Sequence, residues 1–222
     1  MINQHTSPQN RFELVIFDCD GVLIDSEGLS AQVLTENLKE EGVVVDLDYF
    51  RTHLLGRSFA TVVQAIHRGF GVALPQDFEA RYISSLLAGF EHDLRTTEGI
   101  FEVLDSINTR FCVATSSSPR RVAKSLEVVG LSARFRDAVF TASEVENGKP
   151  APDLFLHARC LVIEDSLPGV EAGLAAGMDV VRFLGGAHFT GAPPAAIKNV
   201  DTFDKWTKLV DLRPSLLKGS PR

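Results

Sequence analysis

The chain has 222 residues, of which 45% are hydrophobic and 23% are charged. These values are ordinary for a globular protein, and they exclude an intrinsically disordered or collagen-like chain. The net charge is −7, which argues against nucleic acid or an anionic membrane surface as a partner. It does not argue against a small anionic substrate, because a metal ion or a local field can outweigh the net charge.

Three features of the chain predict its cellular compartment. Cys19, Cys112 and Cys160 each lie in an apolar run, which predicts reduced thiols and no disulfides. The first ten residues are polar and lack the apolar stretch of a secretory signal. No window reaches about 18 consecutive apolar residues, the length of a membrane span. We therefore expect a cytoplasmic protein with no membrane partner.

Short apolar runs mark the expected β-strands. Such runs, rich in β-branched residues, are typical of strands that are buried on both faces. The clearest are residues 14–17, 111–114, 161–163 and 180–183, and residues 139–140 are a weaker fifth. Amphipathic stretches that stop at glycine predict helices over residues 119–129 and 169–176. This alternation predicts an α/β fold, a Rossmann-like parallel sheet core with helices on both faces.

The segment between the first two expected strands has helical patterns and little strand. Its expected helices are residues 29–41, 47–54, 59–70 and 77–94. A helical insertion of this size predicts an α-helical cap domain on the α/β core. The expected division is a core of residues 12–25 and 100–212, a cap of residues 26–99, and a flexible tail of residues 213–222.

Two aspartates directly follow the first expected strand. Asp18 and Asp20 therefore lie at its carboxyl end, where open parallel sheets bind their ligands. Two carboxylates this close repel each other unless a cation or a proton lies between them, and Mg²⁺ together with phosphate oxygens meets this need. One carboxylate can then attack phosphorus, while the other moves protons. The alternative is a solvated acidic loop or a pair of helix N-caps.

Three further polar motifs end expected strands or lie in the loops after them. Thr115 and Ser116 precede a helix, so they can cradle a phosphate or cap that helix. Lys149 lies in a loop, where it can neutralise a phosphate or be solvated. Glu164 and Asp165 end another strand and can bind a metal or cap the next helix. Each motif alone has a structural explanation, and their order along one sheet edge makes the set specific.

With these motifs the sequence resembles the haloacid dehalogenase superfamily, in particular its phosphatase and phosphomutase branch with a helical cap. The resemblance extends from about residue 12 to residue 212. It depends on the segments 18–27, 115–116, 148–153 and 164–166. It implies that Asp18 is the nucleophile and a Mg²⁺ ligand. It also implies that Asp20 is the general acid and base and a ligand through its backbone carbonyl.

The same resemblance assigns roles to the later motifs. Thr115 and the amide of Ser116 would hold the phosphate. Lys149 would stabilise the phosphate and orient the nucleophile. Asp165 would be the third protein ligand of Mg²⁺, and Glu164 would help directly or through water.

Departures within the superfamily narrow the implied activity. Dehalogenases and phosphonatases lack the second aspartate, so Asp20 argues against carbon–halogen and carbon–phosphorus cleavage. β-Phosphoglucomutases carry a histidine where this chain has Ser30. The resemblance is therefore greatest to bacterial sugar-phosphate phosphatases of the 6-phosphogluconate type. A β-phosphoglucomutase-like transfer and a catalytically silent binding protein are the alternatives.

The cap is expected to select the substrate. Arg57 lies in a turn between two expected cap helices, where it can bind a carboxylate or a phosphate, or lie at the surface. His188 follows the last clear strand at the edge of the sheet where it can touch substrate. The expected partner is a small phosphorylated metabolite, and the expected oligomeric state is a monomer or a weak homodimer.

The connection from Asp153 to Glu164 is unusually short. Its ten residues must hold the rest of a helix, a turn and a strand. A parallel crossover normally takes a dozen residues or more. We therefore expect that residues are missing between about 157 and 160, with a genuine deletion as the alternative.

Overall fold

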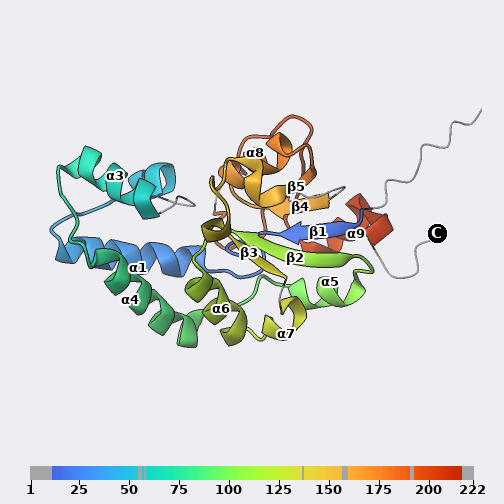
Figure 1. The fold of residues 1–222 in the computed structure, drawn as a ribbon, viewed down its shortest axis with the longest axis horizontal. Coiled ribbons are helices and arrows are strands. Elements are labelled where there is room, and N and C mark those ends of the chain that lie inside the picture. The colour runs from blue at the N-terminus through green and yellow to red at the C-terminus, as the bar shows by residue number, and fades with distance from the viewer. Residues whose placement is uncertain are drawn as a thin grey trace, which may run out of the picture.

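The computed structural model describes residues 12–54, 57, 59–136, 138–156, 160–190 and 193–216. In this part of the chain six β-strands form one parallel sheet, in the order β3-β2-β1-β4-β5-β6 (Figure 1). The strands are β1 (Leu14–Phe17), β2 (Arg110–Thr115), β3 (Val139–Thr141), β4 (Cys160–Glu164), β5 (Asp179–Phe183) and β6 (Asp201–Phe203). The α/β class and the parallel sheet predicted from the sequence are confirmed.

The central strand β1 positions the residues that follow it. Val15, Ile16 and Phe17 are fully buried, because β1 has a strand on each side and is covered on both faces. The register places Phe17 beside Val113 of β2 and Ile163 of β4. The residues after these three therefore meet at one edge of the sheet, at the carboxyl ends of the strands.

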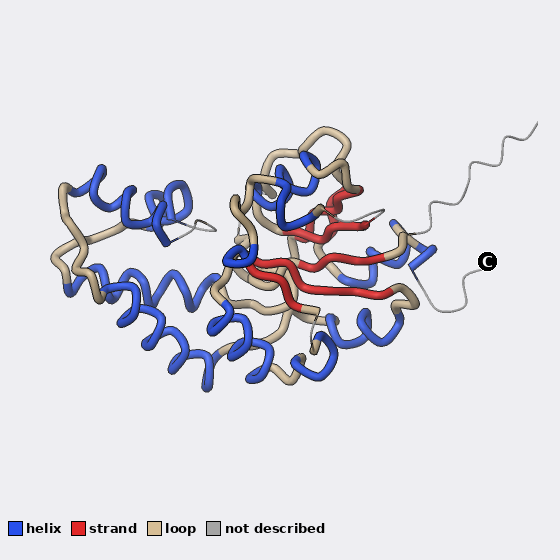
Figure 2. Tube along the Cα trace, viewed as in Figure 1, coloured by secondary structure: helices blue, strands red, loops and turns tan. Residues whose placement is uncertain are grey.

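Alternate residues of the strands face two different layers. Val15 and Phe17 belong to a large apolar cluster that includes residues of α5, α6, α7 and α9. Ile16 and Val162 belong to a second cluster, which includes residues of α8. Figure 2 shows the helices on either side of the sheet. These core helices are α5 (Ile100–Ser106), α6 (Pro119–Val128), α7 (Ser132–Phe135), α8 (Leu167–Ala175) and α9 (Trp206–Leu212).

The chain between β1 and β2 is helical, as predicted. Its elements are α1 (Glu27–Glu40), α2 (Leu47–Tyr49), a π-helical segment (Phe50–Leu54), α3 (Phe59–Phe70) and α4 (Phe78–Asp93). Figure 1 shows α1, α3 and α4 to the left of the sheet, beyond the carboxyl ends of its strands. The single helix predicted over residues 47–54 is instead α2 followed by the π-helical segment. The boundaries of the cap domain stay predictions.

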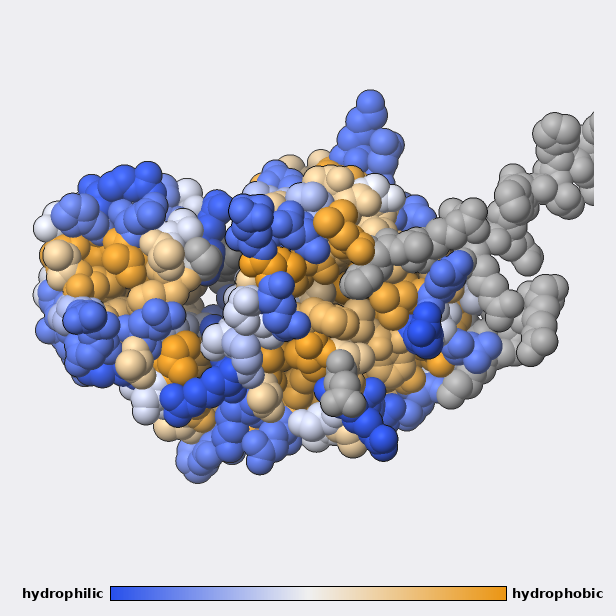
Figure 3. Space-filling model, in the orientation of Figure 1, coloured by the Kyte–Doolittle hydropathy of each residue, from blue (hydrophilic) through white to orange (hydrophobic). Residues whose placement is uncertain are grey.

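The connection from β3 to β4 carries no long helix among its described residues. Two 3-10 turns, Ala142–Glu144 and Pro152–Phe155, take the place of a crossover helix. Accordingly, no described helix lies in front of β1, β2 and β3 in Figure 1, and Figure 3 shows apolar side chains on that face. The junction at which missing residues were predicted, residues 157–159, lies outside the described residues.

Two other predictions concern thiols and membranes. Cys19, Cys112 and Cys160 are buried and form no disulfide. Among the helices that the structure describes, none combines the length and the apolar composition of a membrane span.

Phe135 tests the packing beneath β1 and β2. Its buried ring packs edge-to-face on Phe17 and Phe111, with ring centroids 6.4 Å and 5.2 Å apart. Phe135→Ala leaves a cavity there, so we expect the free energy of unfolding to fall by about 3–5 kcal/mol. Val44→Ala, at a residue that is 73% exposed, should change it by less than about 0.5 kcal/mol. Urea denaturation measures both values, and equal midpoints for the two variants would contradict this packing.

Candidate active site

Three carboxylates converge where β1 and β4 end. Asp18 follows β1 directly, Glu164 is the last residue of β4, and Asp165 follows it. Each of the three contributes a carboxylate oxygen to a group whose members lie within 4.8 Å of one another. All three residues are buried. The backbone of Gly21 closes over this cluster, because a Cβ there would lie 2.0 Å from Oδ2 of Asp165.

Lys149 supplies the positive charge of the cluster. Its Nζ donates to Oδ1 of Asp18 at 2.6 Å, to the carbonyl of Ala114 at 3.0 Å, and to Glu164. The ammonium also lies 5.0 Å from the centroid of the Phe155 ring. Burial lowers the pKa of Lys149, but the carboxylates of Asp18 and Glu164 outweigh burial and raise it. Lys149 therefore remains charged and fixes the orientation of the Asp18 carboxylate.

The single positive charge of Lys149 does not neutralise three buried carboxylates. Burial raises the pKa of Asp18 well above its usual value, and the charges of Glu164 and Asp165 raise it further against the effect of Lys149. Burial and the charge of Glu164 likewise raise the pKa of Asp165. Carboxylates in this condition are stabilised by a further cation, and a set of carboxylate oxygens suits a hard divalent ion such as Mg²⁺. The residues present therefore fit the predicted metal.

Glu164 differs from the other two acids because protein donors surround it. Its carboxylate accepts from Lys149, from the backbone amides of Asp165 and Ser166, each at 3.1 Å, and from Oγ of Ser166 at 3.0 Å. Its side chain is fully buried. This arrangement anchors Lys149 and the start of α8, and it leaves Asp18 and Asp165 as the carboxylates with unmet charge.

Asp20 lies two residues beyond Asp18 in very different surroundings. Its carboxylate accepts from the hydroxyls of Ser26 and Ser117 and from Nη2 of Arg121 at 2.7 Å. Burial raises the pKa of Asp20, but the Arg121 guanidinium and the two hydroxyls outweigh burial, and the net effect lowers it. The structure therefore holds Asp20 as the ionised carboxylate.

The predicted phosphate cradle follows β2. Thr115 is buried at the end of the strand, and its Oγ1 accepts from the amide of Ser117 at 3.1 Å. Ser116 and Ser118 lead into α6, whose first residue is Pro119, a residue favoured at that position. The positive end of the helix therefore faces the site, which favours an anion there.

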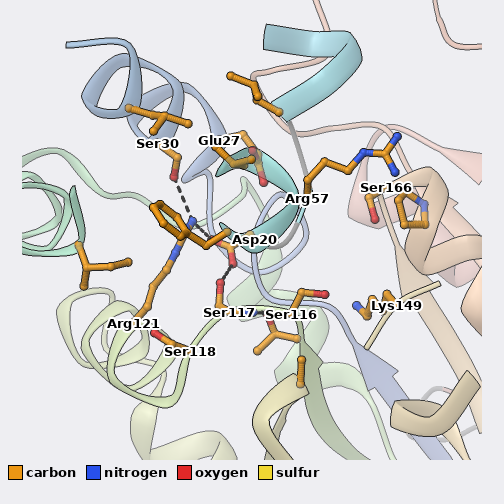
Figure 4. A pocket seen from close by; sticks show the side chains of 18 of the residues that line it. Asp20, Glu27, Ser30, Arg57, Ser116, Ser117, Ser118, Arg121, Lys149 and Ser166 are labelled. Atoms are coloured by element: carbon orange, nitrogen blue, oxygen red, sulfur yellow. Dashed lines mark hydrogen bonds and ion pairs between the residues drawn. The ribbon is translucent and has the colours of Figure 1, made fainter. Parts of the chain in front are cut away.

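One cavity of about 430 Å³, a volume suited to a small metabolite, is lined by Asp18, Asp20, Thr115, Ser116, Lys149 and Asp165 but not by Glu164. Asp20 and Lys149 lie on the sheet side of the cavity, and Glu27, Ser30 and Arg57 come from the helical segment between β1 and β2 (Figure 4). Arg57 is exposed and lines the cavity, and its contact with a substrate stays a prediction.

Sequence reasoning missed three charged residues of the cavity: Arg121, Glu27 and Glu79. Arg121 on α6 binds Asp20, donates to Oγ of Ser30 at 3.0 Å, and lies 5.8 Å from the centroid of the Phe90 ring of α4. Glu27 begins α1 and lines the cavity. The available signal for Arg121 was its place in the first turn of a helix that starts at the active edge of the sheet.

Comparison with known proteins identifies the family. A family model for haloacid dehalogenase-like hydrolases matches residues 12–177. The chain belongs to this family. This haloacid dehalogenase-like hydrolase also resembles a family hydrolase from Deinococcus radiodurans R1, whose crystal structure holds phosphate and sodium. That structure has 30% sequence identity and a TM-score of 0.71, over 95% of this chain and all of the other.

Two curated relatives of this haloacid dehalogenase-like hydrolase are named phosphatases. The 6-phosphogluconate phosphatase of Escherichia coli (strain K12) is 26% identical over 91% of this chain and 95% of the relative. The fructose-1-phosphate phosphatase of the same organism is 30% identical over 77% of this chain and 96% of the relative. The first alignment has 213 positions, but it covers only 91% of the 222 residues of this chain. Some of its positions are therefore gaps in this chain, where the relative has additional residues.

Glu27 makes the stability of this hydrolase depend on pH. Burial, with the charges of Asp20 and Asp165, raises the pKa of Glu27 to about 7. The unfolded chain releases this proton near its ordinary value of 4.5, so the folded state loses stability as the pH rises from about 4.5 through 7. We expect Glu27→Gln to stabilise the metal-free protein by about 2–3 kcal/mol more at pH 8 than at pH 5. Urea denaturation at the two pH values measures this difference.

Glu36→Gln is the matched control, because Glu36 lies on the same helix as Glu27, is exposed and does not line the cavity. It should change stability equally at both pH values. A Glu27→Gln variant that behaves like this control would show that Glu27 ionises normally in the folded protein.

Proposed function

We propose that this hydrolase removes phosphate from a small sugar phosphate through a phosphoryl group carried on Asp18, with Mg²⁺ as the cofactor. The observation that carries this proposal is the convergence of Asp18, Lys149 and Asp165 in one cavity that Asp20 also lines. A nucleophile, a cation and an acid–base group thus face the same small volume. Covalent catalysis of phosphoryl transfer needs these three kinds of group.

Mg²⁺ would be held by the carboxylates of Asp18 and Asp165 and by the backbone carbonyl of Asp20. The charge that burial and crowding leave unmet on the two carboxylates supports this assignment. When bound, the ion neutralises charge on the phosphate oxygens and offsets the repulsion between phosphate and carboxylates. Glu164 takes a supporting part, because its donors come from the protein.

In the first half of the reaction, a carboxylate oxygen of Asp18 attacks phosphorus. The bond from phosphorus to the sugar oxygen breaks, and that oxygen takes a proton from the protonated form of Asp20, which the lowered pKa makes the minor form of this residue. Lys149 holds Asp18 in place and offsets charge on the phosphate. Thr115 and the amide of Ser116 hold the phosphate at the start of α6.

In the second half, the ionised Asp20 takes a proton from water. The resulting hydroxide attacks the phosphorus of phospho-Asp18 and displaces the carboxylate of Asp18. Inorganic phosphate leaves, and Asp20 is again protonated for the next substrate. The lowered pKa of Asp20 favours its ionised form, which is the form that accepts a proton from water.

The proposed substrate class follows from the cavity and from the relatives. Glu27, Ser30 and Arg57 supply polar groups from the helical segment between β1 and β2, and the alcohol part of a phosphate ester would lie beside them (Figure 4). Hydroxyl groups of a sugar or sugar acid can bind such groups. Two relatives are named for a phosphorylated sugar acid and a phosphorylated ketose, which supports the same class.

The test is phosphate release by the purified chain with Mg²⁺ from 6-phosphogluconate, fructose 1-phosphate, glucose 6-phosphate and glucose 1-phosphate. We expect release from at least one of them without added bisphosphate. Chelation by EDTA should abolish release and Mg²⁺ should restore it. Asp18→Asn should lower the rate by at least about 10³-fold, because no other group can take the phosphoryl group. Asp211→Asn, an exposed control, should match the wild type.

Two results would favour the alternatives. Conversion of glucose 1-phosphate into glucose 6-phosphate with little free phosphate would show a mutase, despite Ser30 at the position of the mutase histidine. Absence of turnover on every substrate, with Mg²⁺ bound, would show a binding protein of the same fold.

A further inference from the structure

His188 lies behind the acidic cluster, in the loop that follows β5. Its Nε2 is 3.2 Å from Oδ2 of Asp165. The imidazole is almost buried, with 10% of the side chain exposed. Asp165 lines the cavity, whereas His188 is not among the lining residues. The substrate contact predicted for His188 from the sequence is therefore replaced by a contact with Asp165.

Two glycines enclose the imidazole and the carboxylate. A Cβ on Gly186 would lie 2.8 Å from both Cε1 and Nδ1 of His188, and 3.1 Å from the carbonyl of Gly21. A Cβ on Gly21 would lie 2.0 Å from Oδ2 of Asp165 and 3.1 Å from Cε1 of His188. No side chain fits at either position without displacing the pair. The loops after β1, β4 and β5 are thus packed around this one contact.

The loop that carries His188 is fixed from outside as well. The amide of Ala187 donates to Oδ1 of Asp25 at 3.1 Å, which ties the loop to the segment after β1. The ring centroids of Phe189 and His188 lie 4.0 Å apart. The Cζ atom of Arg182 lies over the Phe189 ring, 5.9 Å from its centroid. These contacts leave the imidazole little freedom to turn.

The distance between the two side chains suits a polar contact. An ionised carboxylate only accepts hydrogen bonds, so Nε2 of His188 can act as its donor. Nδ1 is buried and has no hydrogen-bond partner among the described residues. The backbone carbonyl of Asp165 accepts from Nε of Arg182 at 2.9 Å. Asp165 is therefore held at its carboxylate and at its backbone by two residues outside the cavity.

We propose that His188 is a positioning residue for the metal site, which holds the Asp165 carboxylate in the orientation that the divalent cation needs. This rests on the proposed function in one respect, that Asp165 is a metal ligand. His188 touches neither the substrate nor the reacting atoms. Groups that orient a metal ligand in this way typically contribute 10- to 100-fold to metal affinity.

The test compares three variants of the full chain. His188→Leu removes the donor, and we expect the dissociation constant for Mg²⁺ to rise about 10- to 100-fold in isothermal titration calorimetry. His188→Gln keeps an N–H donor near the place of Nε2, so its affinity should stay within about threefold of the wild type. His67→Leu makes the same change on the exposed part of α3 and should have no effect.

Kinetics on a substrate turned over by the wild type provide a second readout. At saturating Mg²⁺ the KM of His188→Leu for substrate should equal that of the wild type, because His188 is not in the cavity. Circular dichroism establishes that each variant is folded. If His188→Leu does not fold, the affinity of His188→Gln for Mg²⁺ still tests the proposal. A folded Gln variant that shows no specific Mg²⁺ binding would overturn the proposal.

Other results would also overturn it. Mg²⁺ affinity equal to the wild type in folded His188→Leu would show that the contact does not support the metal site. A higher KM at unchanged Mg²⁺ affinity would make His188 a substrate residue. A wild type that binds no Mg²⁺ would overturn this proposal and the metal assignment together. A wild type that binds Mg²⁺ but hydrolyses no sugar phosphate would refute only the proposed function, because the calorimetric comparison needs no turnover.

Discussion

The ion pairs of Lys149 with Asp18 and Glu164 hold the whole site together. Parallel strands bring Asp18, Glu164 and Asp165 to one edge of the sheet, and burial makes their mutual repulsion costly. Lys149 offsets part of that repulsion and reaches the same point from a loop. The charge that Lys149 leaves unmet makes the cluster suitable for a divalent cation, and the proposed binding of Mg²⁺ and phosphate depends on it.

Asp18 and Asp20 show how surroundings divide two identical side chains between two tasks. The pKa of Asp18 is raised by burial and by neighbouring acids, whereas the pKa of Asp20 is lowered because Arg121 and two hydroxyls outweigh burial. Arg121 also joins α6 to α1 through Ser30. The proposed acid–base group is thus connected to the helical side of the cavity, and the proposed nucleophile directly follows the central strand β1.

The sequence allowed prediction of the features that depend on local pattern. The buried strands and Lys149 were found because apolar runs and loop motifs recur in order along the chain. The strand β6 was missed, since it has three residues, two of them exposed. The contact of Arg121 with Asp20 joins residues 101 positions apart, so no local pattern reveals it. His188 was placed at the correct edge of the sheet, but only the packing of three loops shows that it faces Asp165 and not the cavity.

The central claim is that Asp18 carries the phosphoryl group and Asp20 activates the water that removes it. Mass spectrometry of Asp20→Asn fed an aryl phosphate with Mg²⁺ tests this most directly. A good leaving group needs no proton, so phospho-Asp18 should form, and without a base it should persist about 10²–10⁴ times longer than in the wild type. Peptide mapping should place the phosphoryl group on Asp18. A phosphoryl group on another residue, or none while phosphate is still released at the wild-type rate, would contradict this account.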